Sequence, residues 1–157
     1  MWKRFDRIDA AIARWMARNG VTFLRISLGI VFFWFGVLKY FPAASPAEAL
    51  AGKTILVLTF GHVQPNISMP ILATWECLIG IGLLTGFALR VTIFLLFVQM
   101  AGTLLPLFFF PHETFASIPF APTLEGQYII KNLVLISAGL VIGATVRGGR
   151  LTAGPKP

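Results

Sequence analysis

Cysteine is almost absent from this sequence, since Cys77 is the only one in 157 residues. A single cysteine cannot form an internal disulfide, and no Cys-x-x-Cys pair is present to move electrons between thiols. These absences argue against a thiol oxidase that works alone. Metal ligands are also too few for a specific site, because His112 and Glu113 supply only an adjacent pair. We therefore expect no metal site.

Charged residues are scarce as well, at 12% of the chain against 57% hydrophobic residues, and the mean hydropathy is +0.82. A soluble domain of this size would not expose so apolar a surface, so we place the chain in a lipid bilayer. The net charge of +7 does not indicate nucleic-acid binding, because the basic residues lie in short flanks between long apolar runs.

Long apolar runs are what the sequence has instead. A helix needs roughly 20 residues to cross about 30 Å of hydrocarbon, and four runs meet this length. We predict transmembrane helices at residues 21–41, 70–89, 91–110 and 126–146. Only Arg90 separates the second run from the third, which predicts a tight turn and an antiparallel hairpin. The first run also fits a cleaved signal peptide, although its length favours a span.

Basic residues fix the orientation of this predicted bundle, because Lys and Arg near the ends of spans are retained in the cytoplasm. In a four-span arrangement nearly all of them fall on one side, and only Lys53 lies clearly in a loop on the other. We therefore predict that both termini, including the tail 147–157, are cytoplasmic. The connections 42–69 and 111–125 would lie outside.

Three further segments complete the predicted all-α membrane fold. Residues 1–19 place apolar side chains at three- and four-residue spacing among basic ones, which is typical of an amphipathic helix at the inner membrane surface. Residues 46–60 predict a short helix across the outer mouth of the bundle, with residues 55–60 buried. Residues 111–125 contain three prolines that interrupt a helix, so we expect an ordered irregular segment there.

Charged residues inside the spans are the candidate functional residues, because ions in hydrocarbon are costly and usually have a role. At 1.5 Å per helical residue, Glu76 and Lys131 lie about 9 Å and 8 Å below the outer ends of their spans. They could therefore meet, and Lys39 could reach them from the first span. Tyr128 and Asn132 would supply hydrogen bonds. The alternative is an ion pair that only fixes the packing of the helices.

The first span carries its charges and glycines on one helix face, with spacings of four, three, four and three residues. This face consists of Arg25, Gly29, Phe32, Gly36 and Lys39. We expect it to point inward. Arg25 lies near the cytoplasmic headgroups, where a lipid phosphate is its expected contact. In the third span we expect Gln99 to form an interhelical hydrogen bond, which Thr103 could share.

Three segments of the chain resemble the DoxX-like membrane proteins, including relatives linked to reactive-chlorine resistance. They read "FLRISLGIVFFWFGVLKYF", "WECLIGIGLLTG" and "EGQYIIKNLVLISAGLVIG", and the resemblance covers residues 20–146. The positions that match are Arg25, Gly36, Lys39, Glu76 and Lys131. The resemblance implies a four-helix protein of the bacterial inner membrane that is associated with redox work. Some members are subunits of a thiosulfate:quinone oxidoreductase, and others act in oxidative-stress defence with soluble partners.

These features lead to one functional hypothesis and two alternatives. The cluster of Glu76, Lys131 and Lys39 would bind a quinone-like or small anionic ligand beneath the 46–60 helix, in a protein with a redox partner. Whether the chain is itself an enzyme stays open, as does a homo-oligomer, and the sequence has no cofactor motif of its own. The first alternative is a small-solute or ion permeation protein. The second is a non-catalytic membrane scaffold that recruits a soluble oxidoreductase.

Overall fold

The computed structural model describes the backbone of residues 2–41, 48–149 and 151, with side chains from Asp6 onward. Within these residues, four helical segments are long and apolar enough to cross a membrane. They are α1 (Trp2–Leu38), α3 (Pro65–Thr85), α4 (Leu89–Leu104) continued by α5 (Pro106–Phe109), and α7 (Leu124–Thr145). The predicted all-α bundle of four membrane helices is therefore confirmed.

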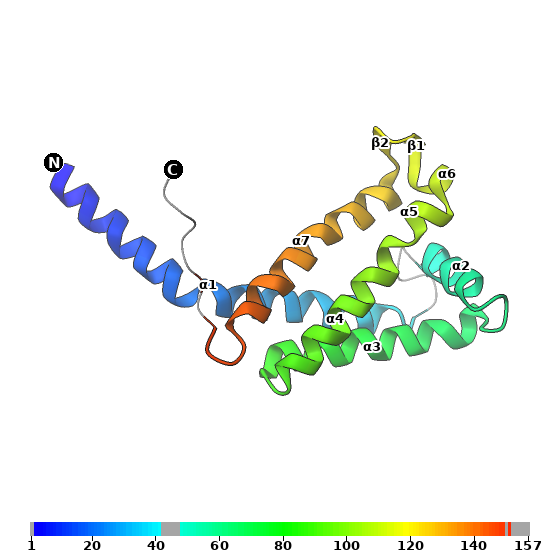
Figure 1. Cartoon of the computed structure of the whole chain (residues 1–157), viewed down its shortest axis with the longest axis horizontal. Helices are drawn as coiled ribbons and strands as arrows, with labels where there is room; N and C mark the ends of the chain where they lie inside the picture. The colour runs from blue at the N-terminus through cyan, green and yellow to red at the C-terminus, as the bar shows by residue number, and fades with distance from the viewer. Residues whose placement is uncertain (1, 42–47, 150, 152–157) are drawn as a thin grey trace.

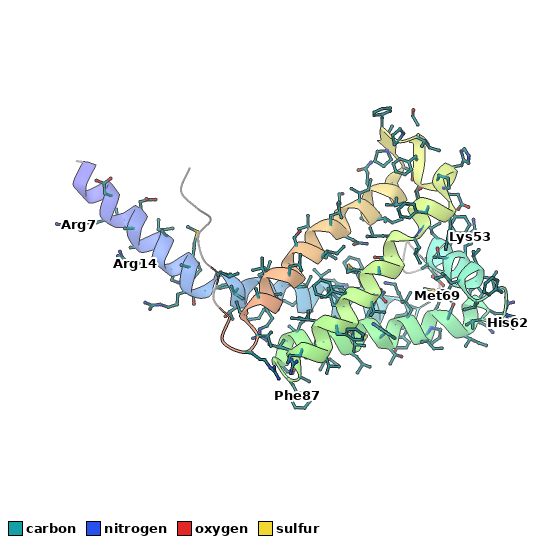
Figure 2. The ribbon with its side chains drawn as sticks, viewed as in Figure 1. Arg7, Arg14, Lys53, His62, Met69 and Phe87 are labelled. Carbon is teal, nitrogen blue, oxygen red and sulfur yellow. The ribbon has the colours of Figure 1, made fainter. Side chains whose placement is uncertain are left out.

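Helix α1 is longer than the predicted span because it joins two predicted helices into one. Most of the predicted segment 1–19 and most of the predicted span 21–41 belong to a single helix of 37 residues, Trp2–Leu38. Gly20 does not interrupt it, since a glycine costs a helix only about 1 kcal/mol relative to alanine. At 1.5 Å per residue α1 is about 55 Å long, more than a bilayer core requires. Its first half points away from the other helices (Figure 1), and Arg7 and Arg14 lie there (Figure 2).

Helices α3 and α4 form the predicted antiparallel hairpin, but the turn lies earlier than predicted. Helix α3 ends at Thr85, and Gly86 and Ala88 take left-handed conformations with φ of 76° and 48°. Arg90 is therefore in the first turn of α4 and not in the connection. Helix α3 also begins at Pro65, five residues before the predicted start, because proline is well suited to the first turn of a helix.

The two ends of the bundle differ in structure (Figure 1). We call one the turn end, which contains Gly86–Ala88 and the end of α7. The other is the loop end, which contains α2 (Glu48–Leu58), α6 (Pro111–Thr114) and the strands β1 (Phe115–Ser117) and β2 (Ala121–Pro122). Between the two ends, all four long helices contribute to one apolar core. Its buried members are Leu28, Phe32, Ile79, Leu83, Ile93, Leu96, Met100, Ala138 and Ile142.

Helix α2 occupies the loop end as predicted, but it buries a different face. Leu50, Gly52 and Thr54 are buried, whereas Phe60 is 90% exposed, so the predicted burial of residues 55–60 is wrong. Gly52 lies against Pro65 at the start of α3, so the buried face of α2 is the one that carries Gly52. Residues 46 and 47 of the predicted helix lie outside the described residues.

The second connection at the loop end is more regular than the irregular segment that we expected. It contains α6 and a two-stranded antiparallel sheet formed by β1 and β2. The buried Thr114 connects it to α7, because its carbonyl accepts a hydrogen bond of 2.9 Å from Thr123 N. Gly126 lies against the same carbonyl, where a Cβ atom would have no room. The start of α7 is thus held by α6.

Candidate functional site

The inward face of α1 meets α3 through glycines on both helices. A Cβ atom on Gly80 would lie 2.5 Å from the backbone nitrogen of Phe33, and one on Gly36 would lie 2.9 Å from that of Cys77. Small residues of this kind let helix backbones approach closely in membranes. The contact places the residues beside Gly36 directly against those around Cys77, and one of them is Glu76.

The predicted stripe on α1 follows this contact along its length. Gly29 lies against Leu83 and Leu84, and Gly36 lies against Glu76 and Cys77. Phe32, between them, is buried in the core. The prediction that this face points inward is therefore confirmed, and its charged residues, Arg25 and Lys39, both contact α3.

A buried polar cluster lies toward the loop end of the bundle, and we call Lys39, Glu76 and Gln99 the Glu76 cluster. Lys39 Nζ lies 2.6 Å from Glu76 Oε2, and the two side chains are 10% and 9% exposed. Gln99 Nε2 donates a hydrogen bond of 2.9 Å to the other carboxylate oxygen, Glu76 Oε1. Glu76 belongs to α3 and Gln99 to α4, whereas Lys39 follows the last residue of α1, and both oxygens of Glu76 are satisfied.

Neighbouring hydrogen bonds hold the backbone on both sides of this cluster. Tyr40, next to Lys39, has its hydroxyl oxygen 2.7 Å from Oγ1 of Thr74. Trp75, next to Glu76, donates from Nε1 to the carbonyl oxygen of Leu95 at 3.2 Å. These bonds connect α3 to the turn that follows α1 and to α4, within a few residues of the ion pair. The geometry of the cluster is therefore supported by contacts that do not involve its charges.

Hydrogen-bonding capacity remains on two members of the Glu76 cluster. An ammonium has three N–H donors, and Lys39 uses two of them, one toward Glu76 and one, at 3.5 Å, toward the carbonyl oxygen of Phe35. Gln99 uses its amide nitrogen, and the hydrogen bonds among the described residues do not involve its amide oxygen. The cluster can therefore offer a further molecule one donor and one acceptor. Its net charge is zero.

Lys131 does not join this cluster, so the predicted contact between Lys131 and Glu76 is wrong. Lys131 is exposed, and its Nζ lies 5.4 Å from the centre of the Tyr128 ring, on its own helix. Tyr128 is exposed and Asn132 is half-buried, and among the described contacts neither hydrogen bonds to the cluster. Two of the five predicted ligand-binding residues, Lys39 and Glu76, are therefore brought together.

The packing of α7 explains why Lys131 stays apart. Lys131 shares a helix face, within about 20°, with Ala138 and Ile142, which are buried in the core. Nearer the loop end, however, α7 is held through Gly126, on a side about 140° away from Lys131. Glu76 and Lys131 can therefore lie at the same depth in the membrane without touching. The face of α7 that is buried at Ala138 is exposed at Lys131.

Arg25 lies at the opposite end of the stripe and contacts protein. Its Nη1 donates to the carbonyl oxygens of Leu83 and Leu84, the latter at 3.3 Å. The last carbonyls of a helix have no partners within the helix, and a cation there also interacts favourably with the helix dipole. Arg25 therefore caps the C-terminus of α3. Its predicted contact with a lipid phosphate stays a prediction.

Gln99 is the member of the cluster that the sequence reasoning did not place at the site. Its interhelical hydrogen bond is confirmed, but Thr103 does not share it and donates instead to Met100 O at 2.9 Å. A usable signal was present in the spacing. Glu76 and Gln99 lie about 15 Å and 16 Å from the turn of the same hairpin, so they face each other across it.

The structure thus defines a class, a multi-pass membrane bundle of four helices with an ion pair enclosed among three of them. A comparison with protein families places the chain more closely. The model of the DoxX family matches residues 20–112, more than half of the chain, so this protein belongs to the DoxX family. The match includes the whole Glu76 cluster and ends before α7. Searches of curated proteins and of solved structures gave no match.

Proposed function

We propose that this protein binds a quinone-like molecule at the Glu76 cluster, as a component of a quinone-linked oxidoreductase or of an oxidative-stress system. The membrane would be the bacterial inner membrane, with the loop end outside. The observation that carries the proposal is an enclosed ion pair that still has hydrogen-bonding capacity. Such a pair within a membrane span is a functional candidate by default.

The remaining donor and acceptor suit the polar groups of a quinone ring. A quinone carbonyl accepts hydrogen bonds, so it can accept from the ammonium of Lys39. The hydroxyl of the reduced form donates hydrogen bonds, so it can donate to the amide oxygen of Gln99. The same two side chains would therefore serve both redox forms, while Glu76 holds them in place through its two oxygens.

The charge of the cluster favours a neutral ligand over an anion. With Lys131 outside, Lys39 and Glu76 cancel, whereas the arrangement expected from the sequence had one surplus positive charge. An anion would have to enter a poorly solvated site without a net countercharge, which is costly. Of the two ligand classes considered, a quinone-like molecule is therefore the better supported.

The test is to purify the full chain from bacterial membranes and quantify the quinone extracted with it by mass spectrometry. We compare it with the double variant Lys39→Met/Glu76→Gln, which removes both charges and so leaves no buried ion unpaired. Loss of a hydrogen bond from a charged group should lower retained quinone by about tenfold or more. Gln99→Leu should lower it less, because that bond is to a neutral amide.

Lys131→Met is the matched control, since it also removes a lysine from a membrane helix but lies outside the cluster. It should retain quinone as the unaltered chain does. Equal retention in the Lys39→Met/Glu76→Gln variant would remove the proposed site. A loss confined to Lys131→Met would move the ligand to α7. The permeation alternative predicts instead a proteoliposome flux that depends on Glu76.

A further inference from the structure

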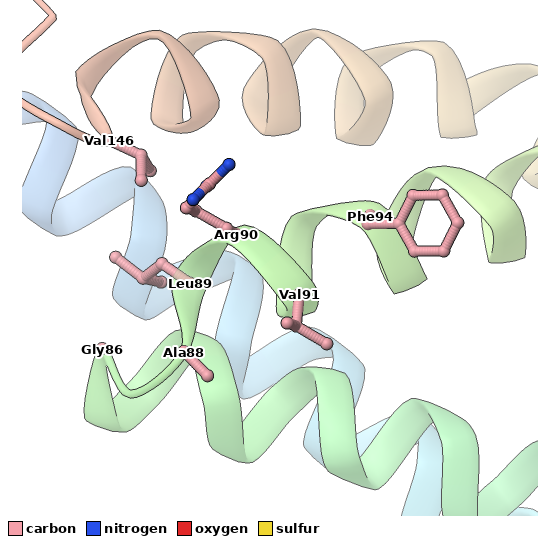
Figure 3. A pocket seen from close by; sticks show the side chains of 7 residues that line it. All are labelled: Gly86, Ala88, Leu89, Arg90, Val91, Phe94 and Val146. Atoms are coloured by element: carbon pink, nitrogen blue, oxygen red, sulfur yellow. The ribbon is translucent and has the colours of Figure 1, made fainter.

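Two adjoining surface pockets lie at the turn end, far from the Glu76 cluster and between the start of α4 and the end of α7. One is lined by Gly86, Ala88, Leu89, Arg90, Val91, Phe94 and Val146, as Figure 3 shows. The other is lined by Arg90, Ile93, Gly143, Val146 and Arg147. Arg90 and Val146 line both, so the two adjoin at these residues, and we call them together the arginine pocket.

Among the residues that the structure describes, the positive charge of this pocket has no acidic partner. Arg90 extends from α4 toward Val146, the residue that follows α7 (Figure 3), and Arg147 comes directly after Val146. In the part of the chain that the structure describes, neither guanidinium forms an ion pair or a hydrogen bond. The six acidic residues of the chain all lie elsewhere, at positions 6, 9, 48, 76, 113 and 125. Both side chains therefore keep all their donors for a ligand.

The rest of the lining is apolar, which restricts the class of ligand that the pocket can bind. Leu89, Val91 and Phe94 form the wall on the α4 side, and Val91 and Phe94 are exposed there. A guanidinium binds phosphate through paired N–H donors, whereas an apolar wall is suited to hydrocarbon. The combination fits a molecule with an anionic phosphate beside an acyl chain.

We infer that the arginine pocket binds the phosphate group of an anionic phospholipid, with Arg90 and Arg147 on the phosphate and the α4 wall on the acyl chain. This site is separate from the Glu76 cluster and does not depend on the proposed function. A free phosphate has the same chemistry without the chain, so the two sources must be distinguished by experiment. If Arg90 and Arg147 only set the orientation of the protein in the membrane, their positive charge would suffice, and neither a pocket nor a guanidinium would be needed.

The test is native mass spectrometry of the full chain in detergent, titrated with phosphatidylglycerol, with phosphatidylcholine, or with inorganic phosphate. We expect one phosphatidylglycerol to bind about tenfold more tightly than phosphatidylcholine, because the latter has a cationic headgroup. Arg90→Gln/Arg147→Gln should abolish this preference. Arg90→Lys/Arg147→Lys, which keeps the charge and the membrane orientation, should weaken it, because lysine lacks the paired donors.

Arg14→Gln/Arg18→Gln is the matched control, since it removes two charges from α1, outside the pocket, and should keep the preference. Inorganic phosphate that competes with phosphatidylglycerol would show that the phosphate subsite suffices, and failure to compete would show that the acyl wall is required. Either result supports the site. Equal binding of the two lipids, or a preference that survives Arg90→Gln/Arg147→Gln or disappears equally in the control, would overturn it.

Discussion

At the scale of single residues, the missing side chain of Gly80 sets how closely α1 approaches α3, and so the position of Lys39 beside Glu76. Gly80→Ala should destabilise the protein by about 1–3 kcal/mol, because the new Cβ would overlap the backbone of Phe33. Gly20→Ala is the control, since no atom would contact its Cβ, and it should stabilise α1 by up to about 1 kcal/mol. Thermal unfolding in detergent measures both. Equal effects would show that the close approach does not matter.

The sequence was informative about single residues where helix periodicity alone decides which way a residue faces. The spacing from Arg25 to Lys39 correctly placed five residues on the inward face of α1, since any straight helix aligns them. The partner of Glu76 could not be chosen in this way. Lys39 and Lys131 were both available at a suitable depth, and only the rotation and packing of α7 exclude Lys131 from the cluster.

At the scale of helices, Arg25 connects α1 to the C-terminus of α3 and so fixes how far one slides along the other. Arg25→Gln removes the charge and shortens the side chain, which leaves the carbonyls of Leu83 and Leu84 without their donor. We expect the protein to lose about 1–3 kcal/mol of stability, measured by thermal unfolding in detergent. Arg14→Gln, on the exposed first half of α1, should change stability by less than about 0.5 kcal/mol. A loss of the same size in both would contradict the capping role.

The existence of the four spans was predictable from the sequence, but their limits were not. Hydropathy detects only the apolar length that lipid requires, so the polar first turn of α3, from Pro65, was invisible to it. The continuity of α1 was not predicted. A change along the sequence from a basic segment to an apolar segment looks the same as a boundary between two helices. The buried face of α2 depends on its contact with Pro65, which no local pattern reports.

At the scale of the whole molecule, the two ends have opposite character. At the turn end Arg90 and Arg147 have no ion-pair partner among the described residues. The loop end carries the polar cluster, the two-stranded sheet and an exposed ion pair of 2.8 Å between Lys53 and Glu113. Figure 2 places Lys53 and His62 near the loop end and Phe87 at the turn. This asymmetry is the arrangement expected when the turn end faces the cytoplasm.

The predicted orientation can be measured with two matched cysteine variants in a Cys77→Ser background. Phe120 at the loop end and Phe87 at the turn end are 88% and 81% exposed, so both should tolerate substitution. In intact cells a membrane-impermeant maleimide should label Phe120→Cys at once. Phe87→Cys should react only after lysis. The reverse pattern would place the termini and the arginine pocket outside.

The most direct test of the central claim, a quinone site at the Glu76 cluster, is photolabelling of the full chain in membranes with an azidoquinone, followed by peptide mapping. The label should concentrate on peptides around Lys39, Glu76 and Gln99. An excess of unlabelled quinone should displace it, and Lys39→Met/Glu76→Gln should lose it while Lys131→Met retains it. Label that is spread over the lipid-facing helices, undiminished by competitor and unchanged in the double variant, would contradict the account.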